Sequence, residues 1–372
     1  NVTAMQRGNA LACDGLPRGE ALHEMTLYST NDYLGMSAHP MVKRAASAAV
    51  ELQGMGPRAS ALVAGHTNEH RNLEVELALL KGKEDCVLFP SGFAANVSVG
   101  ACLASAPDVE VFSDELNHAS IIDGLRIALR KDSKTALKVY RHNDVKHLQE
   151  LLQQSTASKK VVITDSLFSM DGDFAPLQEI AALRAKHGFF FVIDDAHASL
   201  VCGQKGGGAA EAAGIENDVD AVVGTLSKAF GALGGFVCCS SDFRTWLINT
   251  GRPLIYSTAL PAPVVAAAAA ALQVNREEPS IRKHVWDNVE LFSKLTGVEA
   301  SSPIIPVVMG SEERALEASQ RLLRRGIHVP AIRPPTVPKG SARLRVALSS
   351  AHSQSDIETL ASSLKDIGAL SR

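Results

Sequence analysis

The sequence predicts an α/β protein with a mostly parallel, doubly wound seven-stranded β-sheet and a smaller C-terminal α/β domain. Three observations lead to this prediction. From residue 86 onward, short β-branched or aromatic runs alternate with segments of helical spacing, as in chains of strand–helix–strand units. The chain has 372 residues, of which 46% are hydrophobic, so it can bury a large core in about two domains. Polar side chains directly follow several apolar runs, where parallel sheets bind their ligands.

The first part of the chain leads up to the sheet. Residues 1–38 are weakly patterned and are expected to form an N-terminal arm, with a turn at the Asn-Asp-Tyr-Leu-Gly run of residues 31–35. Helical spacing predicts helices over residues 40–53, closed by Gly54, and over residues 68–81, with a glycine-rich loop between them.

A large domain over residues 39–260 is expected to hold the sheet. Its strands are predicted at residues 86–89, 109–112, 137–140, 160–164, 189–193, 219–223 and 236–239. Helices are predicted to begin at Ser91 and to cover residues 119–130, 144–154 and 176–186. Because strands and helices alternate, most neighbouring strands are expected to run parallel, with their carboxyl ends at one edge.

The C-terminal domain, residues 261–372, is predicted to begin with an alanine-rich helix. Strands are expected at residues 304–308, near 328 and at 344–348, and helices at 314–325 and 356–367. Arg343 and Arg345 lie two residues apart on one of these strands and therefore share a face. That face is either a carboxylate-binding site or a solvated edge of the sheet, and the solvated alternative fits Arg343 better than Arg345.

Composition and charge restrict the class of protein. The net charge of −3 offers no basic face for nucleic acid, and no run of 18 apolar residues could span a membrane. The six cysteines show no metal-binding spacing, so no metal site is expected. They are expected to be buried free thiols in a reducing compartment, either the cytoplasm or an organelle lumen. The chain begins at Asn1, which leaves a targeting segment open.

One lysine stands out because its neighbours are apolar, small or hydroxylated. Lys228 ends the Gly-Thr-Leu-Ser-Lys run that follows the strand predicted at residues 219–223. A desolvated lysine loses affinity for its proton and becomes a nucleophilic amine that can form a Schiff base. Thr225 and Ser227 could bind a phosphate beside it. A loop lysine pointing into water is the alternative, and this stretch alone does not decide between the two.

Other predicted strand ends carry further candidate groups. Asp194 and His197 lie just past a strand that should be central and buried, where a carboxylate needs a cationic partner such as a protonated ring nitrogen. Alternatively, Asp194 caps the next element and His197 is a structural histidine. His118 could stack on a flat cofactor or start a helix. Ser169 could donate a hydrogen bond to a cofactor hydroxyl.

A glycine turn offers a candidate anion site. The Ser-Gly-Phe run of residues 91–93 lies between a strand and a helix start, which is typical of anion binding at a helix N-terminus, although an ordinary turn is an equal alternative. The glycine fingerprints of dinucleotide-binding and P-loop proteins are missing from the sequence. A dinucleotide-dependent dehydrogenase is therefore disfavoured.

Taken in order, the motifs resemble those of a known family. They are Asn-Asp-Tyr-Leu-Gly (31–35), Ser-Gly-Phe-Ala-Ala-Asn (91–96), Asn-His-Ala-Ser (117–120), Phe-Ser-Met-Asp-Gly-Asp (168–173), Asp-Asp-Ala-His (194–197), Thr-Leu-Ser-Lys-Ala-Phe-Gly (225–231) and Tyr-Ser-Thr (256–258). The set resembles the α-oxoamine synthases, which are pyridoxal-phosphate (PLP) enzymes of fold type I. Members join an amino acid to an acyl-CoA with loss of CO₂. The resemblance therefore implies a PLP-dependent acyltransferase.

The same resemblance implies roles for individual residues. Lys228 would carry PLP and move protons at the substrate α-carbon, Asp194 would pair with the pyridinium nitrogen, and His118 would stack on the ring. Further cofactor contacts are expected from Gly92, Phe93, Ser169, His197, Thr225, Ser227 and Thr258. Among these, His197 is also expected to be catalytic. Thr258 would reach the cofactor of a partner subunit, which implies a homodimer with shared active sites.

Three residues are expected to contact the substrate by the same resemblance. They are Asn31, Arg333 and Arg345, with Arg345 the better candidate for the amino-acid carboxylate. Residues 331–338 and 343–345 most resemble the branch of the family that serves biotin synthesis, which implies L-alanine and pimeloyl-CoA as substrates. Glycine-using and serine-using relatives are the nearest alternatives. A catalytically silent partner subunit is disfavoured, because such subunits lack a lysine at the position of Lys228.

Overall fold

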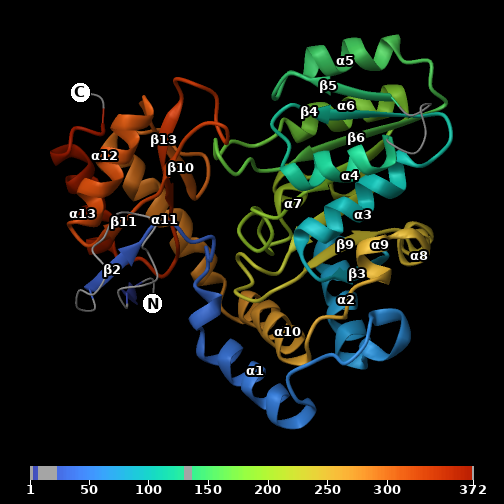
Figure 1. Cartoon of the computed structure of the whole chain (residues 1–372), viewed down its shortest axis with the longest axis horizontal. Helices are drawn as coiled ribbons and strands as arrows, with labels where there is room; N and C mark the ends of the chain where they lie inside the picture. Colours follow the sequence, from blue (N-terminus) through green and yellow to red (C-terminus); the bar gives the residue numbers. More distant parts are fainter. Residues whose placement is uncertain (1–2, 7–22, 130–135, 371–372) are drawn as a thin grey trace. The chain divides into compact units, whose positions relative to one another are not determined.

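The computed structural model describes residues 3–6, 23–129 and 136–370, and Figure 1 shows its elements along the chain. The chain forms two compact units. The C-terminal unit combines Asn1–Gly35, Ser169–Asp173 and Ser280–Arg372. The sheet unit consists of Met36–Phe168 and Phe174–Pro279.

This division differs from the domain boundaries expected at residues 38 and 261. Helix α10 (Ala262–Glu277) belongs to the sheet unit, because it packs against α1 (Pro40–Gln53) and α2 (Asn68–Lys81). At the other end of the chain, β2 (His23–Leu27) joins the C-terminal unit by pairing in parallel with β11 (Ile327–His328).

The sheet unit is built on seven strands in the order β3-β9-β8-β7-β6-β4-β5. The strands are β3 (Asp85–Phe89), β4 (Val109–Asp114), β5 (Ala136–Tyr140), β6 (Lys159–Asp165), β7 (Phe190–Asp194), β8 (Ala221–Thr225) and β9 (Gly235–Cys239). Strand β9 runs antiparallel to β3 and β8, and the other neighbouring strands pair in parallel. The predicted mostly parallel seven-stranded sheet is confirmed, with strand ends shifted by at most two residues.

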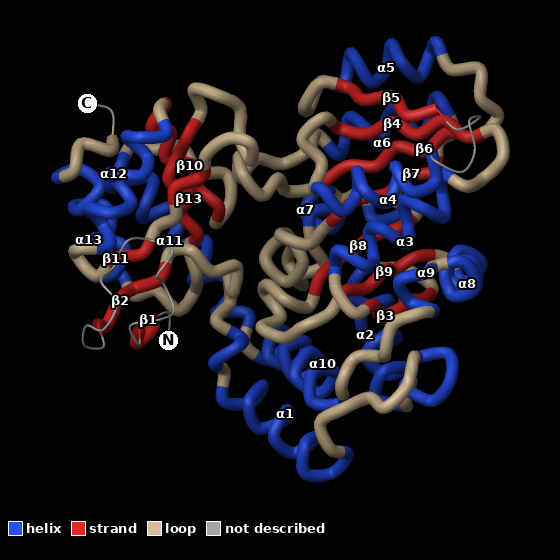
Figure 2. Tube along the Cα trace, in the orientation of Figure 1, coloured by secondary structure: helices blue, strands red, loops and turns tan. Residues whose placement is uncertain are grey.

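Helices cover the sheet (Figure 2), and its inner strands are buried over most of their length, whereas the edge strand β5 is partly exposed. They include α3 (Gly92–Ala104), α4 (Ala119–Leu129), α5 (Val145–Gln154), α6 (Leu177–His187), α7 (Ala209–Ala213), α8 (Ser241–Thr250) and α9 (Arg252–Ile255). Continuous apolar strands are what a sheet buried on both faces requires. Val111, Ile163, Val192 and Val223 are each at most 1% exposed in this core. The five cysteines within the described residues are buried free thiols, as expected, and Cys13 lies outside them.

The described residues of the C-terminal unit form two small sheets, β1-β2-β11 and β10-β13-β12, together with three helices. The elements not yet introduced are β1 (Thr3–Gln6), β10 (Ile304–Gly310), β12 (Ala331–Ile332), β13 (Ala342–Ala347), α11 (Pro279–Thr296), α12 (Glu312–Leu323) and α13 (Gln354–Asp366). Strand β13 is the middle strand of its sheet. The solvated edge considered for Arg343 and Arg345 is therefore wrong, and the two side chains are buried. No helix among the described residues could cross a bilayer.

Candidate active site

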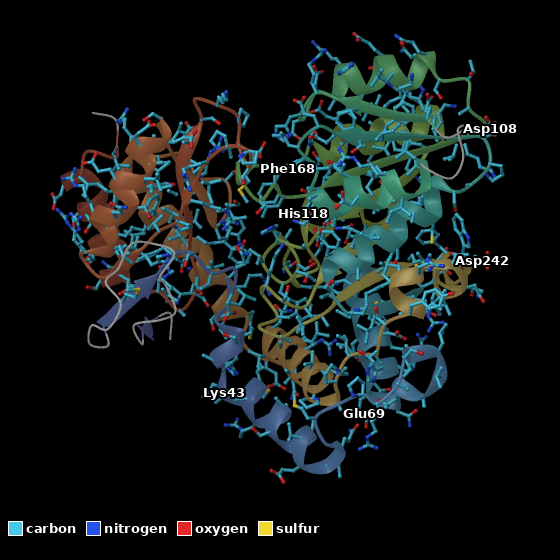
Figure 3. The ribbon with its side chains drawn as sticks, viewed as in Figure 1. Lys43, Glu69, Asp108, His118, Phe168 and Asp242 are labelled. Carbon is cyan, nitrogen blue, oxygen red and sulfur yellow. The ribbon has the colours of Figure 1, made fainter. Side chains whose placement is uncertain are left out.

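The carboxyl ends of several parallel strands place polar residues at one edge of the sheet. Asp165 ends β6 and Asp194 ends β7, and the two lie opposite each other in the ladder. His118, labelled in Figure 3, follows β4, and Lys228 follows β8. Residues far apart in the sequence therefore meet at this edge, as the alternation of strands and helices predicted.

Lys228 lies beside His197 and is half-buried. Its Nζ is 2.8 Å from His197 Nε2, and the His197 side chain is buried. The turn that carries Lys228 is closed by a hydrogen bond from the Gly231 amide to the Lys228 carbonyl, 2.8 Å long. Gly231 has φ +63° and packs so tightly that a Cβ would lie 2.1 Å from the Ser37 amide nitrogen. The amine is therefore held against an imidazole instead of extending freely into water.

Asp194 is a buried carboxylate with no ion-pair partner among the described residues. Its Oδ2 accepts a hydrogen bond from Asn96 Nδ2 at 2.5 Å, and its Oδ1 accepts one from the Ala196 amide at 2.9 Å. Among the described residues it makes no ion pair, although it is only 7% exposed. A buried carboxylate is costly unless a positive charge compensates it. The site thus fits a ligand that brings a cationic group to Asp194, such as a protonated ring nitrogen.

His118 directly precedes helix α4 and lies close to charged groups. Its Nδ1 accepts a hydrogen bond from the Ser120 amide in the first turn of the helix, so His118 does help to start the helix. Its own amide donates to Asp165 Oδ2 at 3.2 Å. Desolvation lowers the pKa of the His118 imidazole, with Asp194 opposing this shift and Lys228 adding to it. A neutral imidazole at neutral pH follows.

Asp165 is a second buried carboxyl group beside Asp194. Its Oδ1 is buried with no hydrogen-bond partner in the described part of the chain. Burial, and after it the negative charge of Asp194, raises the pKa of Asp165 well above its usual range, and Lys228 partly offsets this. Two carboxyl groups at neighbouring strand ends favour one ionised and one protonated group. The cofactor candidate Asp194 therefore has a carboxyl neighbour that is readily neutral.

The first turn of α3 forms the candidate anion cradle. The first amides of any helix lack intrahelical partners, and here Ser91 Oγ caps the helix by accepting a hydrogen bond from the Ala94 amide. The amides before Ala94 in this turn can therefore bind an anion. A Cβ on Gly92 would lie 3.0 Å from Thr225 Cβ, so glycine allows the strand end and the helix to approach. Thr225 Oγ1 lies 2.7 Å from Ser227 Oγ. Amides, a helix dipole and two hydroxyls together suit a phosphate.

Two further predicted cofactor contacts, Phe93 and Thr258, also lie in the sheet unit. Phe93, next to the cradle, is 48% exposed, which leaves its ring accessible to a ligand. Thr258 pairs through an isolated β-bridge with Ser60, directly before the π-helix Ala61–Gly65. In the part of the chain that is described, no cluster of three or more His, Cys, Asp or Glu could hold a metal ion.

The C-terminal unit contains the candidate substrate residues. Arg345 donates through Nε to the Ser169 carbonyl at 2.6 Å, and both terminal nitrogens lie 3.2 Å from Asn31 Oδ1. Arg343 instead bonds Asp171 Oδ1 at 2.5 Å and the Met170 carbonyl. Three predicted contacts, from Arg345, Asn31 and Ser169, are therefore brought together in this unit.

Arg333 is not part of that group. Its guanidinium is exposed, and the nearest carboxylate oxygen, on Glu312, is 4.0 Å away. The resemblance to the α-oxoamine synthases implies that Arg333 contacts the substrate. Among the described residues of its own unit, the Arg333 side chain makes only this long contact with Glu312, which sets it apart from the buried Arg345.

Sequence reasoning missed three polar residues at the sheet edge: Asn96, Ser120 and Asp165. Asn96 lies on α3 and is 2% exposed, and Ser120 lies on α4 and is fully buried. For Asn96 the available signal was that it is the single amide side chain within the apolar run after the Ser-Gly turn. For Asp165 the signal was an acid at a strand end, the same position that drew attention to Asp194.

Comparison with known proteins identifies the family of the chain. The aminotransferase class I and II family matches residues 23–364. An 8-amino-7-oxononanoate synthase from Arabidopsis thaliana is 52% identical over 354 residues, which cover 92% of this chain and 74% of that protein.

Solved structures agree as well. A serine palmitoyltransferase from S. paucimobilis with a bound PLP–myriocin aldimine has 30% identity and a TM-score of 0.86, covering 93% of this chain and 89% of its own. An 8-amino-7-oxononanoate synthase from Francisella tularensis has 27% identity and a TM-score of 0.77, covering 92% of this chain and 96% of its own. The chain therefore belongs to the aminotransferase class I and II family and, within it, to the α-oxoamine synthases, which are PLP-dependent C-acyltransferases of fold type I.

Proposed function

We propose that this chain condenses L-alanine with pimeloyl-CoA to give 8-amino-7-oxononanoate, CoA and CO₂. The 52% identity over 92% of the chain to a relative named for that product supports the choice of substrates. The observation that carries the chemistry is the 2.8 Å contact between Lys228 Nζ and His197 Nε2 at the strand ends that also carry Asp194. An amine beside an imidazole can exchange protons with a bound substrate.

The residues of the sheet unit suit PLP. Lys228 Nζ would bind its aldehyde carbon, and the buried carboxylate of Asp194 would bind its ring nitrogen. The anion cradle at residues 91–93, together with Thr225 and Ser227, would bind its phosphate. Bound there, PLP supplies an electron sink for the electron pair left at the substrate α-carbon.

The protein's own groups would move the protons. Lys228 Nζ takes the proton from the α-carbon of the amino acid once substrate is bound. His197 Nε2, at 2.8 Å, can exchange that proton with Nζ. Arg345 offers a planar guanidinium that suits the amino-acid carboxylate. Its terminal nitrogens now lie 3.2 Å from Asn31 Oδ1. A carboxylate is a stronger acceptor than this neutral amide oxygen and could therefore replace it.

A homodimer follows as part of the proposal. The π-helix Ala61–Gly65 exposes Leu62 and Val63 at 50% and 81%, and nearby Tyr256 is 71% exposed. Exposed apolar side chains gathered in one region suit a protein interface. The bridge from Ser60 to Thr258 sets Thr258 beside this region, where it could contact the cofactor of a second copy. Native mass spectrometry should find a dimer, and a purely monomeric protein would contradict this part.

The substrate is tested by measuring CoA release from PLP-loaded protein with pimeloyl-CoA. L-alanine, glycine and L-serine are offered in separate reactions. Turnover with alanine alone is expected. The TM-score of 0.86 to a serine palmitoyltransferase makes a serine-using acyltransferase the second candidate, so L-serine is also offered with a long-chain acyl-CoA. Turnover only in that reaction, or only with glycine, would replace the proposed substrates.

The Lys228→Ala variant tests the chemistry independently of the substrate. It is expected to lose turnover by several orders of magnitude while keeping the fold, because the amine is needed both to hold PLP and to move the proton. Circular dichroism serves as the folding control. Full activity in this variant would refute the role given to Lys228.

A further inference from the structure

A buried chain of hydrogen bonds joins Asp194 to His118. Asn96 Nδ2 donates to Asp194 Oδ2 at 2.5 Å and to Ser120 Oγ at 2.9 Å. Ser120 Oγ in turn lies 2.7 Å from His118 Nδ1. Asn96 is 2% exposed and Ser120 is fully buried, so bulk water cannot readily replace these bonds.

Donors and acceptors along this chain have one consistent arrangement. The Ser120 backbone amide donates to His118 Nδ1 at 3.3 Å, so Nδ1 presents a lone pair and carries no hydrogen. The Ser120 hydroxyl therefore donates to Nδ1 and accepts from Asn96. Turning the Asn96 amide over would set its oxygen against Asp194 Oδ2, with no hydrogen between the amide oxygen and an ionised carboxylate.

Two glycines bring the helices close enough for this contact. Helices α3 and α4 pack together, with Gly100 one turn after Asn96 and Gly124 one turn after Ser120. A Cβ on Gly124 would lie 2.9 Å from the Asn96 carbonyl oxygen, and one on Gly100 would lie 3.1 Å from the Gly124 carbonyl carbon. Larger residues would push the helices apart and break the bond between Asn96 and Ser120.

We propose that Asn96 and Ser120 are positioning residues that hold His118 as the tautomer protonated on Nε2 and fix the orientation of the Asp194 carboxyl group. The proposal deepens the proposed function, because it rests on His118 and Asp194 lying at the cofactor. His118 Nε2 has no hydrogen-bond partner within the described residues. His118 then acts on a bound substrate as a neutral N–H donor and not as a base.

Desolvation of the imidazole supports the same assignment. It lowers the pKa of His118, which keeps the ring neutral at neutral pH. In a neutral ring the tautomer decides which of the two nitrogens can donate a hydrogen bond. The groups that act on it are Asp194, which favours the charged ring, and Lys228, which disfavours it. The Ser120 amide acts in the same direction as Lys228, since a protonated Nδ1 would face a donor.

The tautomer is tested by solid-state ¹⁵N NMR of the PLP-loaded full chain labelled with ¹⁵N-histidine. The His118 signals are identified by their loss in His118→Phe. The wild type is expected to show a bare Nδ1 and a protonated Nε2. Ser120→Ala is expected to give a mixture of tautomers. Asn96→Ala should shift the His118 Nδ1 signal although Asn96 does not touch His118.

A matched control and a second readout separate this role from general packing. Ser98→Ala also removes a buried hydroxyl from α3, one that donates to the Ala94 carbonyl, and should leave the His118 signals unchanged. Asn96→Ala should weaken PLP binding by about tenfold or more, since it removes a hydrogen bond to a charged group. The pH profile of the bound cofactor's absorbance should shift with it.

Clear outcomes would overturn the proposal. A proton on His118 Nδ1 in the wild type would do so, and this measurement needs no variant to fold. Unchanged His118 signals in both Ser120→Ala and Asn96→Ala would also overturn it, because the backbone amide alone would then set the tautomer. Neither result depends on turnover with L-alanine, so failure of the proposed substrates can be told apart from failure of this inference.

Discussion

Replacing Lys81 by methionine should destabilise the sheet unit by about 3–4 kcal/mol at pH 7, because it leaves a buried carboxylate unpaired. Lys81 is the last residue of α2. Its Nζ donates to Asp195 Oδ2 at 2.5 Å, to Ser199 Oγ at 2.8 Å and to the Gly207 carbonyl at 2.8 Å. The Lys81 and Asp195 side chains are each 1% exposed. All three ammonium hydrogens are therefore used, and methionine of similar length supplies none.

The structure sets an upper limit on this loss. In the variant, Asp195 keeps hydrogen bonds from Ser166 Oγ and from the Ala209 amide, which reduce the loss. The folded protein can also escape the unpaired charge by protonating the carboxyl group. An ordinary aspartate has a pKa of about 3.9, so holding one neutral costs about 4 kcal/mol at pH 7 and about 1.5 kcal/mol at pH 5. The loss should therefore shrink as the pH falls.

Urea unfolding of the PLP-loaded protein at pH 5 and pH 7 measures the effect. Lys83→Met is the matched control, because in the described part of the chain Lys83 Nζ donates to the carbonyls of Glu216 and Val219 and to no carboxylate. Its loss should be the same at both pH values. In Lys81→Met a loss below about 1 kcal/mol at pH 7, or one that does not change with pH, would refute the reasoning.

Two further predictions concern the backbone and the second carboxyl group. Gly172→Ala should lower the free energy of unfolding by about 3–5 kcal/mol, since φ is +67° and the Cβ would lie 1.9 Å from the Ile304 carbonyl oxygen. Gly188→Ala has a similar φ of +66° but open space around the Cβ, so it should lower it by about 1 kcal/mol. Equal urea midpoints for the two variants would contradict this. Burial raises the pKa of Asp165, so the folded protein keeps a proton there that the unfolded chain loses above about pH 4. As the pH rises toward the pKa of Asp165 in the folded protein, the free energy of unfolding therefore falls by about 1.4 kcal/mol per pH unit. Asp165→Asn should remove that fall above about pH 4, and an unchanged pH slope of the urea midpoint would argue against a raised pKa.

Local patterns were enough to predict the strands and most helices of the sheet unit. The run at β7 reads as a strand because aromatic and β-branched residues follow one another without polar interruption, and such runs suit a sheet buried on both faces. Strand ends were accurate to within two residues because glycine, proline and polar residues flank each run. The antiparallel direction of β9 was not predicted, since direction depends on where the chain re-enters the sheet.

Long-range pairing explains where sequence reasoning failed. Residues 1–38 gave a weak pattern because the short strand β2 is completed by β11, about three hundred residues later. For the same reason, Arg343 and Arg345 looked compatible with an edge strand, although β13 lies between β10 and β12. A period of two residues reports which side chains share a face, and it does not report how many neighbours the strand has.

The sequence by itself determined the fold class and the family and singled out the lysine that we propose for the chemistry, because these depend on residue type and spacing along the chain. Only the tertiary structure decided which groups touch. It set Asn96 between Asp194 and Ser120, where α3 and α4 meet at glycines, and it left Asp165 opposite Asp194. Hydrogen bonds and raised pKa values arise from burial and from partners distant in the chain, and neither is written in local spacing.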